Sequence, residues 1–281
     1  MYKSRHVRDK KRYNLFSNQK TYINLGAFSM KRFALYLISP LCLLISWEAA
    51  TYFELLDKRF FPPPSAIFYH LLFVSPDEGL FTDISASLSR IGYGYLSGSI
   101  LGIILGVGMG LYHPLRTLFH PIIMVTYPIP KIAILPLIML IFGIGELSKI
   151  IVVAIGSFFL VLINVLHGVD HLSKIYFDVA HVYKIRRSQL IFHIVLPGIL
   201  PSLFTGLKLA IGYSLVIVVA AEFSGADAGI GYLIWQSWET FSIKSMYAGI
   251  FVIGGLGFIF AYTLDLLERL LLPWHEKKSN F

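Results

Sequence analysis

Long apolar segments separated by short polar ones dominate this sequence. Three segments without Asp, Glu, Lys or Arg, residues 91–115, 150–169 and 245–264, reach the roughly 20 residues of α-helix that cross a bilayer. Three further apolar segments each contain a single charge, Glu48, Lys131 or Lys208. The pattern predicts an all-α, polytopic membrane protein with six transmembrane helices, at about residues 33–53, 88–112, 118–142, 149–169, 202–222 and 246–266.

A polar, amphipathic segment at residues 170–200 separates the fourth predicted span from the fifth. Helical spacing is kept by six apolar residues, Leu172, Ile175, Tyr176, Val179, Val182 and Tyr183, with charged or polar residues between them. This pattern predicts a short helix over about residues 172–187, outside the bilayer, with one apolar face suited to a partner. Proline lacks an N–H and suits the first turn of a helix. Pro197 therefore predicts a sharp turn back into the membrane.

The basic residues are concentrated on one predicted side of the membrane. Lys and Arg number nine in residues 1–32, one in 113–117, four in 170–200 and three in 266–281, which together make 17 of the 24 in the chain. Cytoplasmic loops retain Lys and Arg, so both termini are predicted to be cytoplasmic. A transmembrane domain at 33–275 is expected between a basic, disordered tail at 1–32 and a short cytoplasmic tail at 276–281.

The net charge of +8 has two interpretations. Nucleic-acid binding is one, but no folded domain is predicted to present the basic tail. An anchor on acidic lipid headgroups is favoured, so the expected contact is the lipid membrane and no nucleic acid. The first span is too long for the apolar core of a signal peptide and lacks a convincing cleavage site, so it is expected to be retained.

Glycine recurs at every fourth position of the second predicted span, at Gly94, Gly98, Gly102, Gly106 and Gly110. Within lipid, such a ridge lets another helix approach closely. Four residues at 3.6 per turn rotate each glycine by about 40° from the one before, so the ridge winds round the helix. Helix packing within the subunit is the favoured interpretation, and a seam between two subunits is the alternative.

Lys131 lies near the middle of the third predicted span, after Pro128 and Pro130. An unpaired charge at that depth costs at least ~2.5 to 3.5 kcal/mol. The prolines break a straight helix, which is tolerated where the backbone borders protein or a cavity. Pro130 and Lys131 are therefore candidates for the lining of a translocation pathway, and an internal ion pair for Lys131 is an equal alternative.

Glu222 and Trp235 are candidates at the outer end of the fifth span. Glu222 ends its predicted helix, where the helix dipole does not favour a carboxylate, so another group is expected to hold it in a gate contact. Residues 229–238 are expected to form a loop that is either an interfacial aromatic belt or a lid containing Trp235. Lys208 is close enough to the cytoplasmic end to reach the headgroups.

Motifs for catalysis are missing from the sequence. It contains no GxxxxGK[ST] phosphate-binding motif. His167 and His171 are four residues apart, but no HExxH motif or third ligand accompanies them, so no metal site is predicted. Cys42 is the single cysteine, which excludes an internal disulfide. The chain is therefore predicted to be no enzyme and to bind no cofactor of its own.

Residues 178–197 resemble the EAA loop of ABC importer permeases, in which Glu-Ala-Ala, three residues, Gly and nine residues precede Ile-x-Leu-Pro. The corresponding residues are Asp178, Val179, Ala180, Lys184, Ile194, Leu196 and Pro197. Asp replaces Glu, Val replaces the first Ala, and Lys184 replaces a glycine that would allow a turn with positive φ. The resemblance implies that this segment, with Val182 and Tyr183, docks onto an ATPase.

Further motifs, in order along the chain, resemble the sulfonate, taurine, nitrate and thiamine-precursor branch of these permeases. They are Trp47-Glu48, Pro62-Pro-Pro-Ser-Ala66, Ser87-Leu-Ser-Arg90 with Gly92, residues 127–136, residues 142–149, Gly206-Leu-Lys208, Ala221-Glu222 and residues 229–234. The resemblance implies a type I ABC importer permease in a bacterial inner membrane.

The same resemblance implies the partners. They are an ABC ATPase, in two copies, which binds ATP and Mg, a second and identical permease, and a periplasmic or lipid-anchored substrate-binding protein. The solute is expected to be small and often anionic, of the sulfonate, nitrate or vitamin-precursor class. The alternatives are a secondary transporter, which usually needs ionisable coupling groups and an internal repeat, and a membrane scaffold without ATPase coupling.

Overall fold

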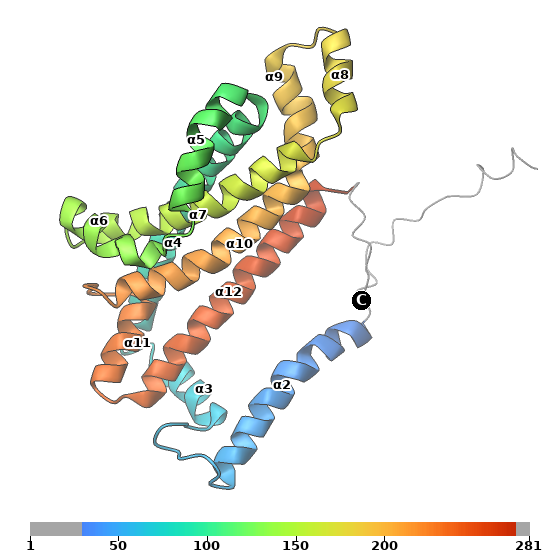
Figure 1. The fold of residues 1–281 in the computed structure, drawn as a ribbon. Coiled ribbons are helices and arrows are strands. Elements are labelled where there is room, and N and C mark those ends of the chain that lie inside the picture. Colours follow the sequence, from blue (N-terminus) through green and yellow to red (C-terminus); the bar gives the residue numbers. More distant parts are fainter. Residues whose placement is uncertain (1–29, 274–281) are drawn as a thin grey trace, which may run out of the picture. The chain divides into compact units, whose positions relative to one another are not determined.

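The computed structural model of this protein describes residues 30–273, and every regular element in that range is a helix, which confirms the all-α class. The predicted tails at 1–32 and 276–281 lie largely or wholly outside these residues. The chain divides into two units, residues 1–55 and 56–281. The first unit contains the 23-residue helix α2 (Met30–Tyr52), which covers most of the first predicted span. The second contains the other helices (Figure 1).

Three long helices form the centre of the second unit: α4 (Leu80–Leu111), α7 (Glu146–Asp170) and α10 (Leu196–Glu222). α7 packs against both of the others. Its residues Val152, Val161 and Val165 are completely buried. α4 starts eight residues before the predicted position 88, and α10 starts six residues before 202. The core of the protein therefore lies along α7.

α3 (Pro64–Phe73) and α11 (Ile230–Glu239) lie at the end of this unit where α10 terminates, and the long helix α12 (Ile243–Leu271) runs from that end along α10 (Figure 1). α12 packs on α3, α11 and α10. The prediction of a loop at 229–238 is wrong, because a helix begins at Ile230, directly after Gly229. That glycine has φ of +134°, a conformation that L side chains rarely adopt.

The third predicted span is broken. α5 (His113–Thr126) is followed by the 3-10 turn η1 (Lys131–Ile134) and by α6 (Leu135–Phe142), and the two halves meet at 93°. Pro128 and Pro130 lie in the break, and each removes a backbone N–H that a continuous helix would need. The expected break of a straight helix at these prolines is therefore present, as a bent pair within the predicted span 118–142.

The connection between α7 and α10 also differs from its prediction. α8 (Lys174–Val182) ends five residues before position 187, where the sequence pattern had placed the end of the helix. α9 (Arg187–Leu190) then continues through the π-helix η2 (Ile191–Val195) into α10, so that residues 187–222 form one helical run. The sharp turn lies before Arg187 and not at Pro197, which occupies the first turn of α10.

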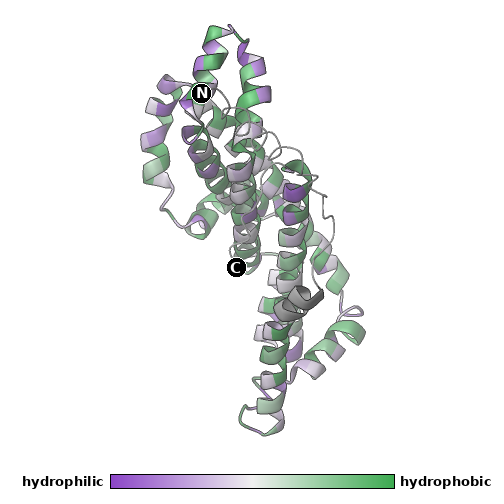
Figure 2. Ribbon diagram, turned by 90° about the vertical axis from the view of Figure 1, so that its right-hand side faces the viewer, coloured by the Kyte–Doolittle hydropathy of each residue, from purple (hydrophilic) through white to green (hydrophobic). Residues whose placement is uncertain are grey.

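Four helical runs among the described residues are long and apolar enough to cross a membrane: α4, α7, residues 187–222 and α12. The bent pair raises this number to five if it is one span. Figure 2 shows hydrophobic residues along the length of these helices. A sixth crossing by α2 stays a prediction.

Candidate functional site

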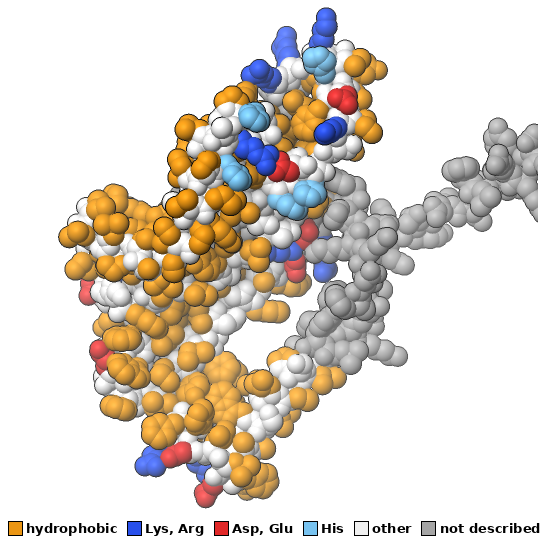
Figure 3. Space-filling view, viewed as in Figure 1, with side chains coloured by type: hydrophobic (Ala, Val, Ile, Leu, Met, Phe, Trp, Pro, Cys, Tyr) orange, Lys and Arg blue, Asp and Glu red, His pale blue; other side chains and the backbone are white. Residues whose placement is uncertain are grey.

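The connection between α7 and α10, which we call the coupling loop (residues 171–186), presents apolar side chains to solvent. On α8, Ile175, Val179 and Val182 share one face and are 68%, 45% and 76% exposed. The opposite face is anchored, because Ala180 is buried and Phe177 packs against the core formed by α4, α7 and α10. α8 is therefore fixed by one face and displays the other. Figure 3 shows Lys, Arg and His side chains gathered over α5, α8 and α9.

Lys184 makes the turn that the family glycine would make. Its φ is +51°, in the left-handed region that favours glycine. The N–H of Lys184 donates to the carbonyl oxygen of His181 at 3.1 Å, and that of Ile185 donates to Ala180 at 3.0 Å. These two bonds close the helix in the usual manner of a left-handed C-cap. The lysine therefore preserves the backbone turn, at the expense of steric strain.

The remaining residues of the EAA-like motif are spread over α8, η2 and α10. Asp178, Val179 and Tyr183 are exposed. Ile194 lies in the π-helix, and Leu196 and Pro197 begin α10, all three half-buried. The motif thus links the exposed helix to the root of α10.

The five glycines of α4 all lie against α7. A Cβ atom on Gly98 would lie 2.1 Å from the carbonyl oxygen of Ala154, and one on Gly110 would lie 2.6 Å from Val169. The contacts of Gly102 and Gly106 fall between these two points along α7, and those of Gly94, Ile150 and Val153, come just before Ala154. A four-residue repeat keeps facing one neighbour only if the two helices coil round each other. The ridge therefore packs within the subunit along nearly the whole of α7.

Lys131 lies in the break of the third span and bonds to backbone carbonyls at the end of α5. Only 4% of it is exposed, and its Nζ donates to the carbonyl oxygens of Thr126 at 2.8 Å and Tyr127 at 3.1 Å. Nζ also lies 4.1 Å from the ring centroid of Phe159 on α7. The carbonyls are those left unpaired where α5 ends. Within the described residues the lysine therefore contacts carbonyls and an aromatic ring, and not the carboxylate that an ion pair would need.

A buried polar cluster, which we call the Arg90 cluster, joins four segments at the end of the unit opposite α8. Arg90 of α4 has a side chain that is 2% exposed. It donates to the carboxylate of Glu146 at 2.5 and 2.6 Å, to Glu222 at 2.6 Å and to the carbonyl oxygen of Ala228 at 2.7 Å. One guanidinium therefore connects α4 to the first turn of α7, the last turn of α10 and the segment before α11.

Glu222 is held from several directions, as its position at a helix C-terminus requires. The Ser87 hydroxyl lies 2.7 and 2.9 Å from its two carboxylate oxygens, and the Gly231 N–H donates to it at 2.7 Å. Ser87 in turn accepts the N–H of Ile230 at 2.8 Å, and Asp83 accepts that of Gly229 at 2.8 Å. The start of α11 is thereby fixed to α4 through backbone hydrogen bonds.

The sequence analysis identified Glu222 but not the other members of the cluster, Arg90, Glu146, Ser87 and Asp83. Ser87 and Arg90 share one motif of the resemblance, Glu146 and Glu222 belong to two others and Asp83 to none, and Arg90 lies 132 positions from Glu222. The sequence nevertheless contained a signal for the Arg90–Glu222 pair. Arg90 stands at the border of a long charge-free segment, where an arginine needs a carboxylate partner, and Glu222 occupies the corresponding place in the fifth span.

Trp235 and Lys208 have contacts that the sequence did not predict. The Trp235 indole on α11 donates to Glu239 at 2.9 Å, and its ring packs between Phe223 and Trp238. Lys208 forms ion pairs with Asp265 and Glu268 of α12. The expectation that Lys208 reaches the headgroups is therefore corrected to a contact between α10 and α12. The pathway roles of Pro130, Lys131, Glu222 and Trp235 stay predictions.

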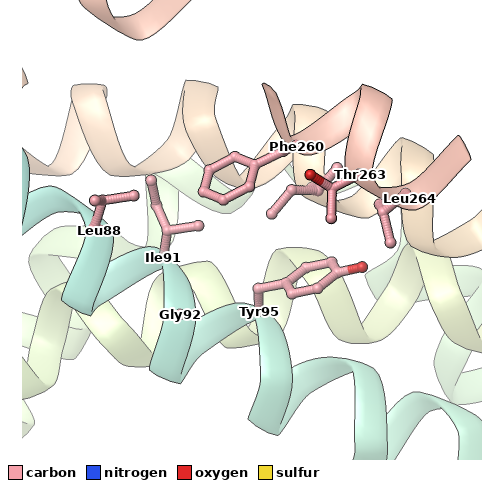
Figure 4. A pocket seen from close by; sticks show the side chains of 8 residues that line it. Leu88, Ile91, Gly92, Tyr95, Phe260, Thr263 and Leu264 are labelled. Atoms are coloured by element: carbon pink, nitrogen blue, oxygen red, sulfur yellow. The ribbon is translucent and has the colours of Figure 1, made fainter. Parts of the chain in front are cut away.

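An apolar cavity of about 220 Å³ lies between α4, α10 and α12 (Figure 4). Tyr95, Phe260 and Thr263 are among the residues that line it, and the Tyr95 hydroxyl donates to the carbonyl oxygen of Leu207 at 3.2 Å. No charged side chain is among the lining residues. The cavity is therefore unsuited to an anionic solute.

Comparisons with known proteins agree with this architecture. Residues 98–273 match the family model of binding-protein-dependent transport system inner membrane components. The taurine transport system permease protein TauC of Escherichia coli K12 is 34% identical over 238 residues, which are 83% of this chain and 86% of TauC. The nitrate import permease protein NrtB of Leptolyngbya laminosa is 33% identical over 201 residues, 72% of each chain.

Solved structures show the same fold. An inward-facing structure of the MetNI methionine ABC transporter matches with a TM-score of 0.60 at 16% identity, covering 71% of this chain and 99% of the MetNI chain. An amino acid ABC transporter matches with a TM-score of 0.53 at 17% identity. The architecture is therefore that of the membrane subunits of type I ABC importers.

The chain belongs to the family of binding-protein-dependent transport system inner membrane components, in the branch that contains the taurine, sulfonate, nitrate and thiamine-precursor permeases. It is a multi-pass permease subunit of an ABC importer and not an enzyme, since the ATPase of such importers is a separate subunit.

Proposed function

We propose that this permease forms the translocation pathway for a small solute that carries an oxyanion group, and that it is driven through the coupling loop. Two identical permeases would pair over two cytoplasmic ATPases, which bind ATP and Mg. A substrate-binding protein would deliver the solute on the outer side. Both termini would be cytoplasmic.

The exposed apolar face of α8 is the observation that carries the proposal. Water does not favour Ile175, Val179 and Val182 on one face of a helix that lies outside the predicted spans. An apolar groove on a partner would cover them. Closure of the ATPase dimer would then move α8 as a rigid body, together with the helical run 187–222 that follows it.

The solute class is supported by the relatives. Taurine, aliphatic sulfonates, nitrate and bicarbonate are the solutes in the names of several of them. A buried cation in the broken span, Lys131, is compatible with an anion when the break opens. Impaired import by a Lys131→Gln variant of normal abundance would support this role. A formylaminopyrimidine permease at 27% identity makes a vitamin precursor the second candidate.

Replacement of Val182 by Asp tests the docking role. Val182 is 76% exposed, so the carboxylate stays hydrated in the isolated permease and the fold is unaffected. In an apolar groove the same carboxylate would be dehydrated without a partner. We expect normal permease levels in the membrane, loss of the co-purified ATPase and loss of solute uptake.

His181→Asp is the matched control, because it places the same charge on the neighbouring residue, about 100° round the helix. It should retain the ATPase. The docking assignment is wrong if Val182→Asp keeps the ATPase bound, or if both variants release it equally.

A further inference from the structure

We propose that a pocket beside the coupling loop binds the headgroup of an anionic phospholipid. The pocket has a volume of about 580 Å³ and lies between the junction of α4 with α5 and the helices α8 and α9. Tyr112, His113 and Arg187 form its polar side, and Leu111, Phe177 and Leu190 are among the residues of its apolar side. A cation and an aromatic hydroxyl thus lie next to an apolar wall, which is the chemistry of a lipid headgroup and its first acyl carbons.

Arg187 supplies the charge. Its Nη1 donates to the Tyr112 hydroxyl at 2.7 Å, and its guanidinium carbon lies 5.3 Å from the centroid of the Tyr112 ring. Among the described residues, no carboxylate forms an ion pair with it. The guanidinium is therefore oriented by an aromatic ring while other N–H groups remain available, and a phosphate diester can accept two of them at once.

The depth of the pocket favours a lipid over a soluble anion. α4 ends at Leu111, α5 begins at His113, and the helical run that becomes α10 begins at Arg187. Two candidate spans, α4 and the run 187–222, and the first half of the bent pair therefore reach their ends round the pocket, at the level where we place the lipid headgroups. Basic pockets between helix ends at that level attract acidic lipid. Figure 3 shows that Lys, Arg and His side chains surround this region.

A lipid at this position would contact α8 on its anchored face, opposite the exposed apolar face. Phe177 lies on the anchored face of α8, and Arg187 is the first helical residue after the turn at Lys184. Occupancy would therefore hold α8 against the α4–α5 junction. This consequence rests on the proposed docking role, whereas lipid binding itself does not depend on it.

Lipid retention by the full-length permease provides the test. The protein would be placed in nanodiscs of phosphatidylcholine containing phosphatidylglycerol, extracted gently and analysed by native mass spectrometry. Arg187→Gln should lower the retained phosphatidylglycerol by about tenfold, because it removes a charge-assisted contact. Arg186→Gln, at the exposed neighbour outside the pocket, should retain the lipid, and Arg187→Lys should retain part of it.

Other outcomes would overturn the site. Equal retention by Arg187→Gln and the parent protein, or equal loss in Arg186→Gln, would show only general attraction of acidic lipid. Displacement of phosphatidylglycerol by inorganic phosphate would identify a soluble anion as the ligand. Displacement by the ATPase would show that this surface belongs to the protein partner. If the Val182→Asp variant keeps its ATPase while Arg187→Gln loses lipid, the docking role fails and the lipid site stands.

Discussion

The helical run 187–222 has a buried, paired charge at one end and, at the other, an exposed charge without an acidic partner in the described part of the chain. At one end, Glu222 is buried and accepts hydrogen bonds from Arg90, Ser87 and Gly231. At the other end, Arg187 is exposed and lacks an acidic partner among the described residues, beside apolar side chains that face solvent. The charges at the Glu222 end are paired within one chain, whereas the Arg187 end presents an exposed cation and exposed apolar side chains that a partner could cover. Substitutions at the two ends should therefore separate folding from assembly.

The largest effect is expected from Arg90→Met. This change leaves Glu222 buried without its cation and Glu146 without its bidentate partner. Breaking a buried ion pair in this way destabilises proteins by about 3 to 5 kcal/mol. We expect a strong loss of folded permease, measured as membrane abundance and as the unfolding midpoint in detergent.

Arg59→Met provides the matched control for Arg90→Met. Arg59 pairs with Asp57 at 2.8 Å on the exposed connection before α3, where its guanidinium lowers the pKa of the Asp57 carboxyl through a hydrogen bond. Exposed pairs contribute little, so abundance should not change. Equal effects of the two substitutions would mean that the Arg90 cluster contributes no more to stability than a surface ion pair.

A smaller effect, of about 1 to 3 kcal/mol, is expected from Gly98→Ala, because overpacking a well-packed core costs about this much. The added methyl group would lie 2.1 Å from the carbonyl oxygen of Ala154, which belongs to the rigid backbone of α7. The helices must therefore separate. The unfolding midpoint in detergent measures the loss.

Gly92→Ala is the corresponding control on the same helix, since a Cβ there meets nothing within 4 Å. It should stabilise the protein slightly, because alanine favours a helix by up to ~1 kcal/mol over glycine. Opposite signs for the two substitutions would confirm the glycine ridge as the α4–α7 contact, and equal signs would contradict it.

The smallest effect is expected at the coupling end. Lys184→Gly should raise the free energy of unfolding by at most about 1 kcal/mol, because it relieves a left-handed side-chain conformation but adds freedom to the unfolded chain. Lys174→Gly, at the first residue of α8, should instead lower it slightly, because glycine adds freedom to the unfolded chain without relieving any strain. Chemical denaturation in detergent compares them. A destabilised Lys184→Gly variant would mean that the lysine makes a contact worth more than its strain.

Local features were predicted from sequence better than distant contacts. The prolines at 128 and 130 indicated the break in the third span, and the glycine period indicated a closely packed neighbour. The end of α8 was misplaced, since the apolar period continues to Tyr183 although the backbone turns at Lys184. The ion pairs of Arg90 and Lys208 join residues 56 or more positions apart. Charge periodicity within one helix carries no information on which distant helix supplies the partner.

The uninterrupted helix from Arg187 to Glu222 also has a mechanical meaning. Its 36 residues have a length of about 50 Å along the helix axis, at 1.5 Å per residue. Glu222 at its C-terminal end is hydrogen-bonded to Arg90 of α4 and Gly231 of α11, and Arg90 in turn binds Glu146 of α7. Under the proposed docking role, a displacement of α8 would reach α10 through continuous helical backbone and not through a loop, although the run changes direction between α9 and α10 (Figure 1). The π-helical turn at Ile191–Val195 is the segment of this run with a different helical pitch, and we expect any bending of the run to occur there.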